Sequence, residues 1–244
     1  MSVYTCSDLH GMFYFYNEIK RSLQPDDIVI YLGDAGDRGP RPWQTIKAIL
    51  EDPQFIYLKG NHEDMLCKAL IECLTQKTLT TKTHRLLGLN DALSTLEQAL
   101  GELDVTGYQK KLEELPLTYE YTNKQGQKIY LSHAGFTPWK SEDESQELVL
   151  PFDEDLLWDR DHFLDGWSSE ECIDCYIVHG HTPIPYLLDD IDPACLMGEI
   201  EPGALWYDDG RKCCVDCGAV FTGYCVLLDL DTWEEKVFQT EPIN

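Results

Sequence analysis

The stretch Ile28-Val29-Ile30-Tyr31-Leu32-Gly33-Asp34-Ala35-Gly36-Asp37-Arg38-Gly39 combines two kinds of sequence. Its first five residues are apolar and mostly β-branched or aromatic, which is typical of a buried strand. The rest is rich in glycine and aspartate, which favour loops. We expect a helix to follow over about Pro42–Glu51. The stretch therefore predicts a strand, a polar loop and a helix in succession.

The same succession occurs on both sides of this stretch. It begins with an expected strand at Val3–Thr5 and again at Phe55–Leu58, and a helix is expected after each. The loops that follow these strands are Ser7-Asp8-Leu9-His10-Gly11 and Gly60-Asn61-His62-Glu63. Three such units predict βαβ connections and a parallel sheet. Ligands of such sheets gather at the carboxyl ends of the strands, where all three polar loops fall.

The rest of the chain changes character twice. Residues from about 75 to 115 have helical spacing with no strand signal, and we expect a helical insertion there. Strands then return as a hairpin over 118–122 and 128–132, at Cys175–Val178, and over about 204–239. With no linker and no second core in view, we predict one domain over residues 1–244 that contains this insertion.

Charge and composition exclude several classes of function. The 244 residues include 44 acidic and 19 basic ones, which gives a formal net charge of −25. Such a surface repels nucleic acids and anionic membranes, although bound cations can reverse the sign locally. No apolar run approaches the ~18 residues of a membrane span, and the first residues lack a signal-peptide pattern. We therefore predict a cytoplasmic protein with reduced thiols, no membrane partner and no nucleic-acid partner.

Residues with metal-binding side chains follow most of the expected strands. They are Asp8, His10, Asp34, Asn61, His133 and His181, with His179 as a further candidate. Imidazole, carboxylate and amide oxygen suit a transition metal, and so many donors suit two ions ~3.5–4 Å apart that share a carboxylate. In an extended chain Asp8 and His10 would point to the same side. The histidines that do not follow an expected strand, His84 and His162, are expected to be solvated.

Five ordered segments carry a family resemblance. They are Ser7-Asp8-Leu9-His10-Gly11, Gly33-Asp34-Ala35-Gly36-Asp37-Arg38-Gly39, Gly60-Asn61-His62-Glu63, Ser132-His133-Ala134-Gly135 and Gly180-His181-Thr182-Pro183. This set resembles the calcineurin-like metallophosphoesterases, within them the phosphoprotein phosphatase branch of bacterial serine/threonine protein phosphatases and symmetrical diadenosine tetraphosphatases. The resemblance implies an α/β four-layer sandwich, with two mixed β-sheets flanked by helices and the small helical insertion.

The resemblance also implies roles at the metal centre. Asp8 and His10 would hold one metal ion, Asn61, His133 and His181 would hold the other, and Asp34 would bridge the two. The cofactors would be two divalent transition-metal ions, with manganese as our first choice and iron or zinc as alternatives. His179 would lie behind the ligands.

Catalytic and phosphate-binding roles are implied for four further residues. His62 would protonate the leaving oxygen, oriented by Asp37, while Arg38 and Arg160 would bind the phosphoryl oxygens. Planar guanidinium groups bind phosphate in a bidentate manner better than lysine does. We expect one-step hydrolysis by a metal-bridging hydroxide, without a phosphoenzyme.

Two features depart from the family pattern. Bacterial relatives often carry Asn-Gly-Gly-x-x-Thr after the third helix, whereas this chain has Asn90-Asp91-Ala92-Leu93-Ser94-Thr95. The segment Asp216-Cys217-Gly218 stands where the family usually has Asp-Thr-Gly. In addition, two C-x-x-C pairs (Cys172 and Cys175, Cys214 and Cys217) either bind zinc or are buried thiols.

Three functions stay open at this point. Hydrolysis of phosphoserine or phosphothreonine in a phosphorylated protein is our first hypothesis, and symmetrical cleavage of a dinucleoside tetraphosphate is the second. A non-catalytic metal- or phosphate-binding module is the third. The sequence does not determine the oligomeric state.

Overall fold

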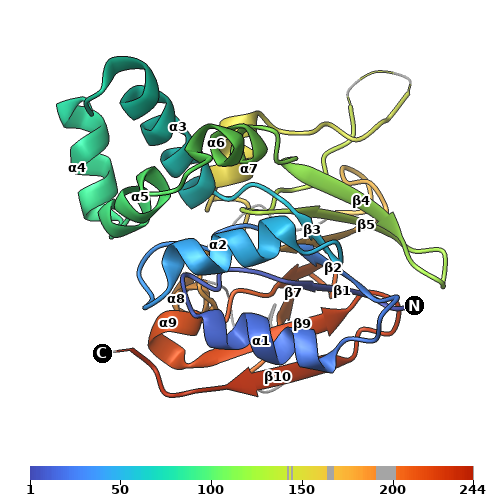
Figure 1. Ribbon diagram of the computed structural model, residues 1–244. Helices are drawn as coiled ribbons and strands as arrows, with labels where there is room; N and C mark the ends of the chain where they lie inside the picture. Colours follow the sequence, from blue (N-terminus) through green and yellow to red (C-terminus); the bar gives the residue numbers. More distant parts are fainter. Residues whose placement is uncertain (142, 144, 164–167, 191–201, 244) are drawn as a thin grey trace.

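Two five-stranded sheets form the centre of the molecule. The structure is a computed structural model that describes residues 1–141, 143, 145–163, 168–190 and 202–243 (Figure 1). The strand order is β10-β9-β1-β2-β3 in the first sheet and β4-β5-β6-β8-β7 in the second. Two facing sheets with helices outside them confirm the α/β sandwich that the family resemblance implied.

The first sheet contains the three predicted βαβ strands. β1 (Val3–Cys6), β2 (Ile28–Tyr31) and β3 (Phe55–Tyr57) are parallel, while β9 (Tyr224–Asp229) and β10 (Glu235–Gln239) are antiparallel additions beside β1. The connecting helices are α1 (Phe13–Ser22) and α2 (Pro42–Glu51), which both cover the outer face of this sheet in Figure 1. Their buried side chains, such as Phe15 and Ile46, join Val29 and Tyr31 in one core cluster.

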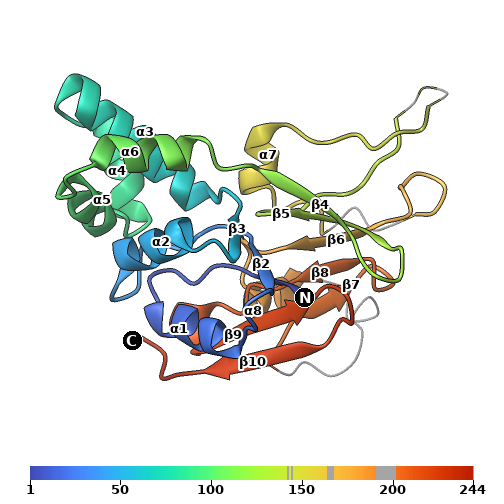
Figure 2. The ribbon, with the colours of Figure 1, turned by 45° about the vertical axis from the view of Figure 1, so that its right-hand side comes forward.

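The second sheet is also mixed. β5 (Lys128–Ser132), β6 (Tyr176–His179) and β8 (Lys212–Cys214) are parallel, and β4 (Thr118–Thr122) and β7 (Leu205–Tyr207) pair antiparallel at its two edges. Apolar side chains of both sheets meet in a second core cluster, including Ile30, Leu228, Leu131 and Val178. The sheets therefore pack face to face, and the short helix α7 (Asp153–Trp158) lies near the second sheet (Figure 2).

Four helices between β3 and β4 stand together beside the sheets in Figures 1 and 2. They are α3 (Asn61–Gln76), α4 (Thr81–Leu89), α5 (Leu93–Leu100) and α6 (Val105–Glu113). The helical spacing predicted over residues 75–115 is interrupted between α4 and α5, where Asp91 takes a left-handed φ of 55°. Leu87 and Leu112 of these helices belong to the same core cluster as α1 and α2. This shared core supports our proposal that residues 75–115 are an insertion within a single domain over residues 1–244.

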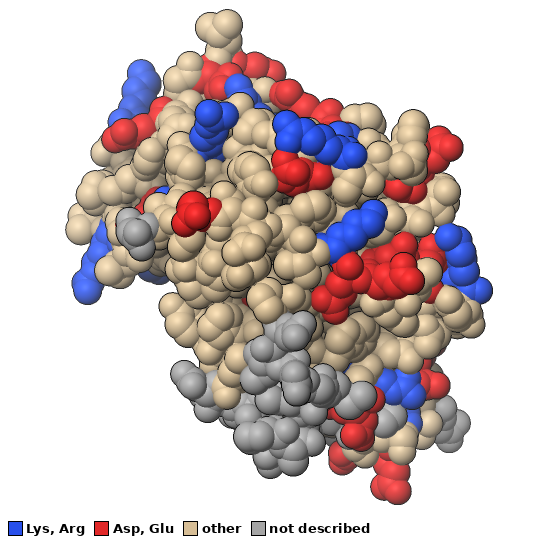
Figure 3. Space-filling view, turned by 90° about the horizontal axis from the view of Figure 1, so that it is seen from below, with Lys and Arg blue, Asp and Glu red and all other residues tan. Residues whose placement is uncertain are grey.

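The C-terminal region contains two short helices that the sequence did not suggest. α8 (Ile184–Asp190) follows β6, and α9 (Ala219–Thr222) precedes β9. None of the helices in the described ranges is long and apolar enough to cross a bilayer. On the face shown in Figure 3, basic and acidic side chains of the described residues are interspersed, without a broad basic patch.

Candidate metal centre

Strand ends of both sheets bring the predicted ligands to one place. Asp8 and His10 follow β1, and Asp34 follows β2. Asn61 and His62 are the first two residues of α3, directly after β3. From the second sheet, His133 follows β5 and His181 follows β6. The six candidate ligands are all at most 5% exposed: Asp8, His10, Asp34, Asn61, His133 and His181.

The backbone of these loops is unusual. Asp8, His10, Asp34 and His181 have φ values of 52°, 41°, 58° and 67°. Left-handed conformations of non-glycine residues cost energy and cluster at functional sites. The extended-chain argument for Asp8 and His10 is therefore wrong, because both residues are left-handed. Their side chains still approach each other, with 3.9 Å between His10 Nε2 and Asp8 Oδ1.

One glycine shows how tightly the loops pack. A Cβ atom on Gly180 would lie 2.2 Å from Asp8 Oδ2. Close approach of backbone to a functional carboxylate is a position that only glycine permits. The small residue between His179 and His181 therefore lets the two sheets join at this site.

A first group of donor atoms surrounds His10. Its Nδ1 donates to Gly36 O at 2.9 Å, which leaves the Nε2 lone pair directed at the site. That Nε2 lies 3.6 Å from Asp34 Oδ2. Asp8 Oδ1 is buried and has no hydrogen-bond partner. A buried carboxylate oxygen without a partner is costly, and a cation beside it would remove that cost.

A second group surrounds His133. Its Nδ1 donates to Leu32 O at 2.7 Å, so its Nε2 faces the site as an acceptor. This Nε2 lies 2.9 Å from Asn61 Oδ1 and 3.1 Å from His181 Nδ1. Asp34 Oδ1 lies 3.5 Å from the same Nε2. Asp34 thus directs one oxygen to each group, a geometry that is compatible with a carboxylate shared by two metal ions.

Burial sets the electrostatics of both groups. It raises the pKa of Asp8 to about 7, with repulsion from Asp216 adding to the effect. It also raises the pKa of Asp34 well above the usual range, and Asp8 reinforces this shift. For His10, burial and the nearby Arg38 hold the pKa well below its usual value. Neutral imidazoles and mutually repelling carboxylates are a donor set that fits divalent cations.

His62 and Asp37 form the expected pair beside the first group. His62 Nδ1 lies 2.5 Å from Asp37 Oδ2, and His62 Nε2 lies 3.8 Å from Asp34 Oδ2. Thr95 donates from its hydroxyl to the other Asp37 oxygen. From the sequence, Thr95 was identified only as part of the segment that departs from the Asn-Gly-Gly-x-x-Thr pattern. The structure instead connects the helical segment to the carboxylate that orients His62.

Glu63 is a second residue to which the sequence analysis gave no role. Its Oε2 accepts hydrogen bonds from Asp34 N at 2.7 Å and Gly60 N at 3.0 Å, and its Oε1 accepts from Ala35 N at 3.0 Å. Glu63 is fully buried. A glutamate at the third position of a helix, bonded to the N–H of the N-cap residue, is half of a capping box, and this position could have identified it. It fixes the loop that presents Asp34.

Two exposed arginines lie over the donor groups. Arg38 Nη1 donates to His10 Nε2 at 2.7 Å, and its Nη2 donates to His62 Nε2 at 3.2 Å. Arg160 Nε donates to His181 Nε2 at 3.2 Å. Each arginine thus lies against a different donor group. Two guanidinium groups in such positions could bind the oxygens of one phosphoryl group.

The remaining histidines and the cysteines lie outside the donor groups. His179 ends β6, and its Nε2 is 2.7 Å from the Tyr207 hydroxyl. The expectation for His162 is wrong: it is 1% exposed and donates from Nε2 to Ala134 O at 2.8 Å, whereas His84 is exposed as expected. Among the described residues, the groups that could hold a metal are His10, Asp34 and His62, and Asp34, His133 and His181. Neither contains a cysteine, and all four C-x-x-C cysteines are buried: Cys172, Cys175, Cys214 and Cys217.

Comparisons with known proteins identify the family to which the chain belongs. Residues 1–214 match the family model described as calcineurin-like phosphoesterase. The chain is 27% identical over 218 residues to a protein of Anoxybacillus flavithermus named bis(5′-nucleosyl)-tetraphosphatase (asymmetrical), covering 78% of this chain and 84% of that one. A protein of the same name from a Geobacillus species is 24% identical over 226 residues, covering 81% and 87%.

A solved structure shows the same fold. The chain superimposes on a metallophosphoesterase from Sphaerobacter thermophilus with a TM-score of 0.56 and 16% sequence identity, over 99% of this chain and 88% of that one. The family model covers most of the chain, and the strand-end loops of the chain converge on one site as described above. The chain therefore belongs to the calcineurin-like phosphoesterase family and is a metallophosphoesterase, a hydrolase that acts on phosphoesters.

Proposed function

We propose that this hydrolase uses two metal ions and that its substrate is a dinucleoside tetraphosphate. The observation that carries the dinuclear part is Asp34, whose two oxygens lie at different donor groups, 3.6 Å from His10 and 3.5 Å from His133. The names of the two sequence relatives support the substrate. The phosphoserine or phosphothreonine hypothesis becomes the second candidate. It stays open because the exposed Arg38 and Arg160 suit a terminal phosphoryl group equally well.

The ligand assignment follows the two donor groups. Asp8 and His10 would bind one ion, and Asn61, His133 and His181 would bind the other. Asp34 would be a ligand of both ions. When bound, two divalent cations would offset the charge of the phosphoryl group and acidify a water molecule for attack. Manganese remains our first choice, with iron or zinc as alternatives, since these ligands suit all three metals.

The protein's own groups would then complete the reaction. Arg38 and Arg160 would turn from the imidazoles they contact to the phosphoryl oxygens, which would free the Nε2 atoms of His62 and His181. Burial lowers the pKa of His62 well below its usual value. A charged Asp37 at Nδ1 would favour the protonated imidazole, so that Nε2 could carry a proton to the leaving oxygen. Thr95 would hold Asp37 in place.

One experiment tests both the activity and the substrate. The protein would be loaded with Mn²⁺, and cleavage of diadenosine tetraphosphate would be followed by product chromatography beside phosphate release from a phosphothreonine peptide. We expect faster cleavage of the dinucleotide. AMP with ATP would indicate asymmetrical cleavage, and two ADP would indicate the symmetrical cleavage that the sequence analysis considered.

An Asp34→Asn variant is the control, because it should lose both metal and turnover. Faster turnover of the peptide would favour the second candidate. No turnover of either substrate, with two ions bound, would support the non-catalytic module instead. The cytoplasmic location remains a prediction of the sequence.

A further inference from the structure

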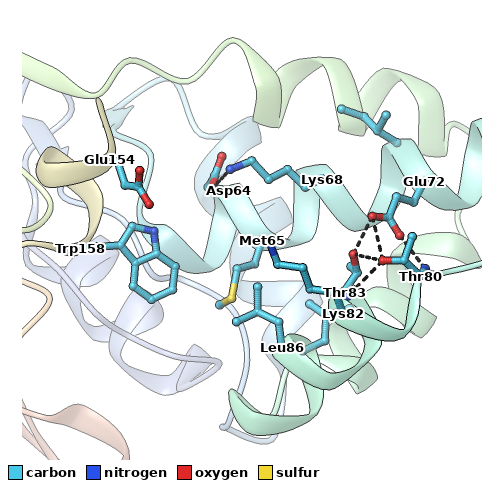
Figure 4. A pocket seen from close by; sticks show the side chains of 12 residues that line it. Asp64, Met65, Lys68, Glu72, Thr80, Lys82, Thr83, Leu86, Glu154 and Trp158 are labelled. Carbon is cyan, nitrogen blue, oxygen red and sulfur yellow. Dashed lines mark hydrogen bonds and ion pairs between the residues drawn. The ribbon is translucent and has the colours of Figure 1, made fainter. Parts of the chain in front are cut away.

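A cavity of about 530 Å³ lies along α3, the helix that begins with Asn61 and His62 (Figure 4). One wall is the face of α3 that carries Met65, Lys68 and Glu72, and the opposite wall is α4 with Lys82 and Leu86. Trp158 of α7 closes one end. A volume of several hundred Å³ is typical of small-molecule sites.

The cavity adjoins the metal centre through Trp158. The Trp158 ring is edge-on to the His181 ring, with 6.2 Å between the ring centroids. Trp158 also lies two residues before Arg160 in the chain, and it is 37% exposed. Met65 lies one helical turn after His62 on α3. A substrate held at the donor groups could therefore extend past Trp158 into the cavity.

The lining combines apolar surface with two ammonium groups, Lys68 and Lys82, and with three carboxylates, Asp64, Glu72 and Glu154. Met65 is 2% exposed, and Leu86 and the Trp158 indole add further apolar surface. Lys68 Nζ lies 2.6 Å from Asp64 Oδ2 at the Trp158 end of the cavity. In Figure 4, Lys82 extends from α4 across the cavity toward Met65. Lys68 is paired with Asp64, and Glu72 accepts hydrogen bonds from Thr80 and Thr83, so Lys82 is the ammonium group that Figure 4 shows directed into the cavity.

This combination favours a nucleotide over a peptide. A phosphopeptide presents one phosphoryl group, which the metal ions and the two arginines would already bind. A dinucleoside tetraphosphate carries further phosphates beyond the one attacked, and these need cations outside the metal centre. An aromatic ring and apolar side chains in turn suit a nucleoside, because every base has a face that can stack.

We propose that this cavity binds the nucleotide portion of a dinucleoside polyphosphate that lies beyond the scissile phosphate. Trp158, Met65 and Leu86 contact the nucleoside, and Lys82 contacts its phosphates. This inference rests on the proposed function, since it assigns a subsite to that substrate. Lys82 is the most informative position, because it lies on α4, away from the donor groups and from Arg38 and Arg160.

The test compares Lys82→Ala with Lys110→Ala, an exposed lysine on α6 outside the cavity. For each protein, kcat/KM is measured with diadenosine tetraphosphate and with p-nitrophenyl phosphate, which is too small to reach the cavity from the metal centre. We divide kcat/KM for diadenosine tetraphosphate by kcat/KM for p-nitrophenyl phosphate. We expect this ratio to fall about tenfold in Lys82→Ala, as for loss of a hydrogen bond to a charged group. The ratio should stay at the wild-type value in Lys110→Ala.

A binding measurement separates this inference from the proposed function. ATP is titrated into the Mn²⁺-loaded wild type and both variants, and we expect a Kd about tenfold weaker only for Lys82→Ala. Absent phosphoester turnover in the wild type, together with that weaker Kd, would refute the proposed function and leave the nucleotide site standing. An unchanged ratio and an unchanged Kd would overturn the inference. So would a selective loss of phosphothreonine-peptide cleavage in Lys82→Ala.

Discussion

The Glu63→Gln substitution probes how the Asp34 loop is held. The Glu63 carboxylate accepts three backbone hydrogen bonds, from Asp34, Ala35 and Gly60. A glutamine has one carbonyl oxygen, so its NH₂ group must face at least one of these N–H donors. Burial raises the pKa of Glu63, whereas the same three N–H groups favour its charged form.

The expected cost follows from the least damaging orientation of the glutamine. If its oxygen keeps the bonds from Asp34 and Gly60, the bond from Ala35 is lost, at about 1.5–3 kcal/mol for a hydrogen bond to a charged group. For a chain of this size, each kcal/mol lowers Tm by about 2–4 °C. We therefore expect Tm to fall by roughly 3–12 °C. Metal affinity should fall about 10- to 100-fold, because Glu63 holds a ligand loop without itself being a ligand.

Thermal unfolding and metal analysis would be run on Glu63→Gln beside Glu97→Gln. Glu97 is an exposed residue of α5 and makes the same chemical change away from the site. A Glu63→Gln protein that kept the wild-type Tm and metal affinity would refute the reasoning. That result would mean that the three N–H groups do not require a carboxylate.

Further predictions concern the acid, its support and the buried carboxylates. His62→Asn should lower kcat by at least 100-fold, as expected for a lost general acid, with metal content unchanged. Loss of metal would instead show that His62 is a ligand. The metal content is therefore measured, because His62 Nε2 lies 3.8 Å from Asp34 Oδ2. Thr95→Val should lower kcat several-fold at constant KM, since it removes only the donor to Asp37; a change confined to KM would count against this role. Burial raises the pKa of Asp8 to about 7 from an ordinary 3.8, so the native metal-free protein binds a proton that the unfolded chain releases. The Tm of chelator-treated wild type, taken relative to that of chelator-treated Asp8→Asn, should therefore fall as pH rises from about 4 to 7, because the buried histidines with lowered pKa values contribute to both proteins alike; a rise in that difference would contradict the pKa of Asp8.

Local sequence was sufficient for the three strand–loop–helix units of the first sheet and for the family. The helix predicted over Pro42–Glu51 has those bounds in the structure, and the strand run ending at Leu32 forms β2 as far as Tyr31. Hydrophobic periodicity and turn residues act over a few positions, so they predict helices and strands without knowledge of tertiary contacts. The metal-binding residues of the strand-end loops could be predicted for the same reason, since each motif is a short contiguous segment.

The tertiary structure alone decided how these segments combine. His162 was expected in solvent from its acidic surroundings, yet the chain folds it onto Ala134, 28 residues earlier. Thr95 reaches Asp37 across 58 residues, and His181 reaches Asn61 across 120. The cavity beside Trp158 likewise forms only where α3, α4 and α7 meet. Such contacts depend on how the two sheets and the helices pack, and the pattern of neighbouring residues in the sequence does not encode that packing in a readable form.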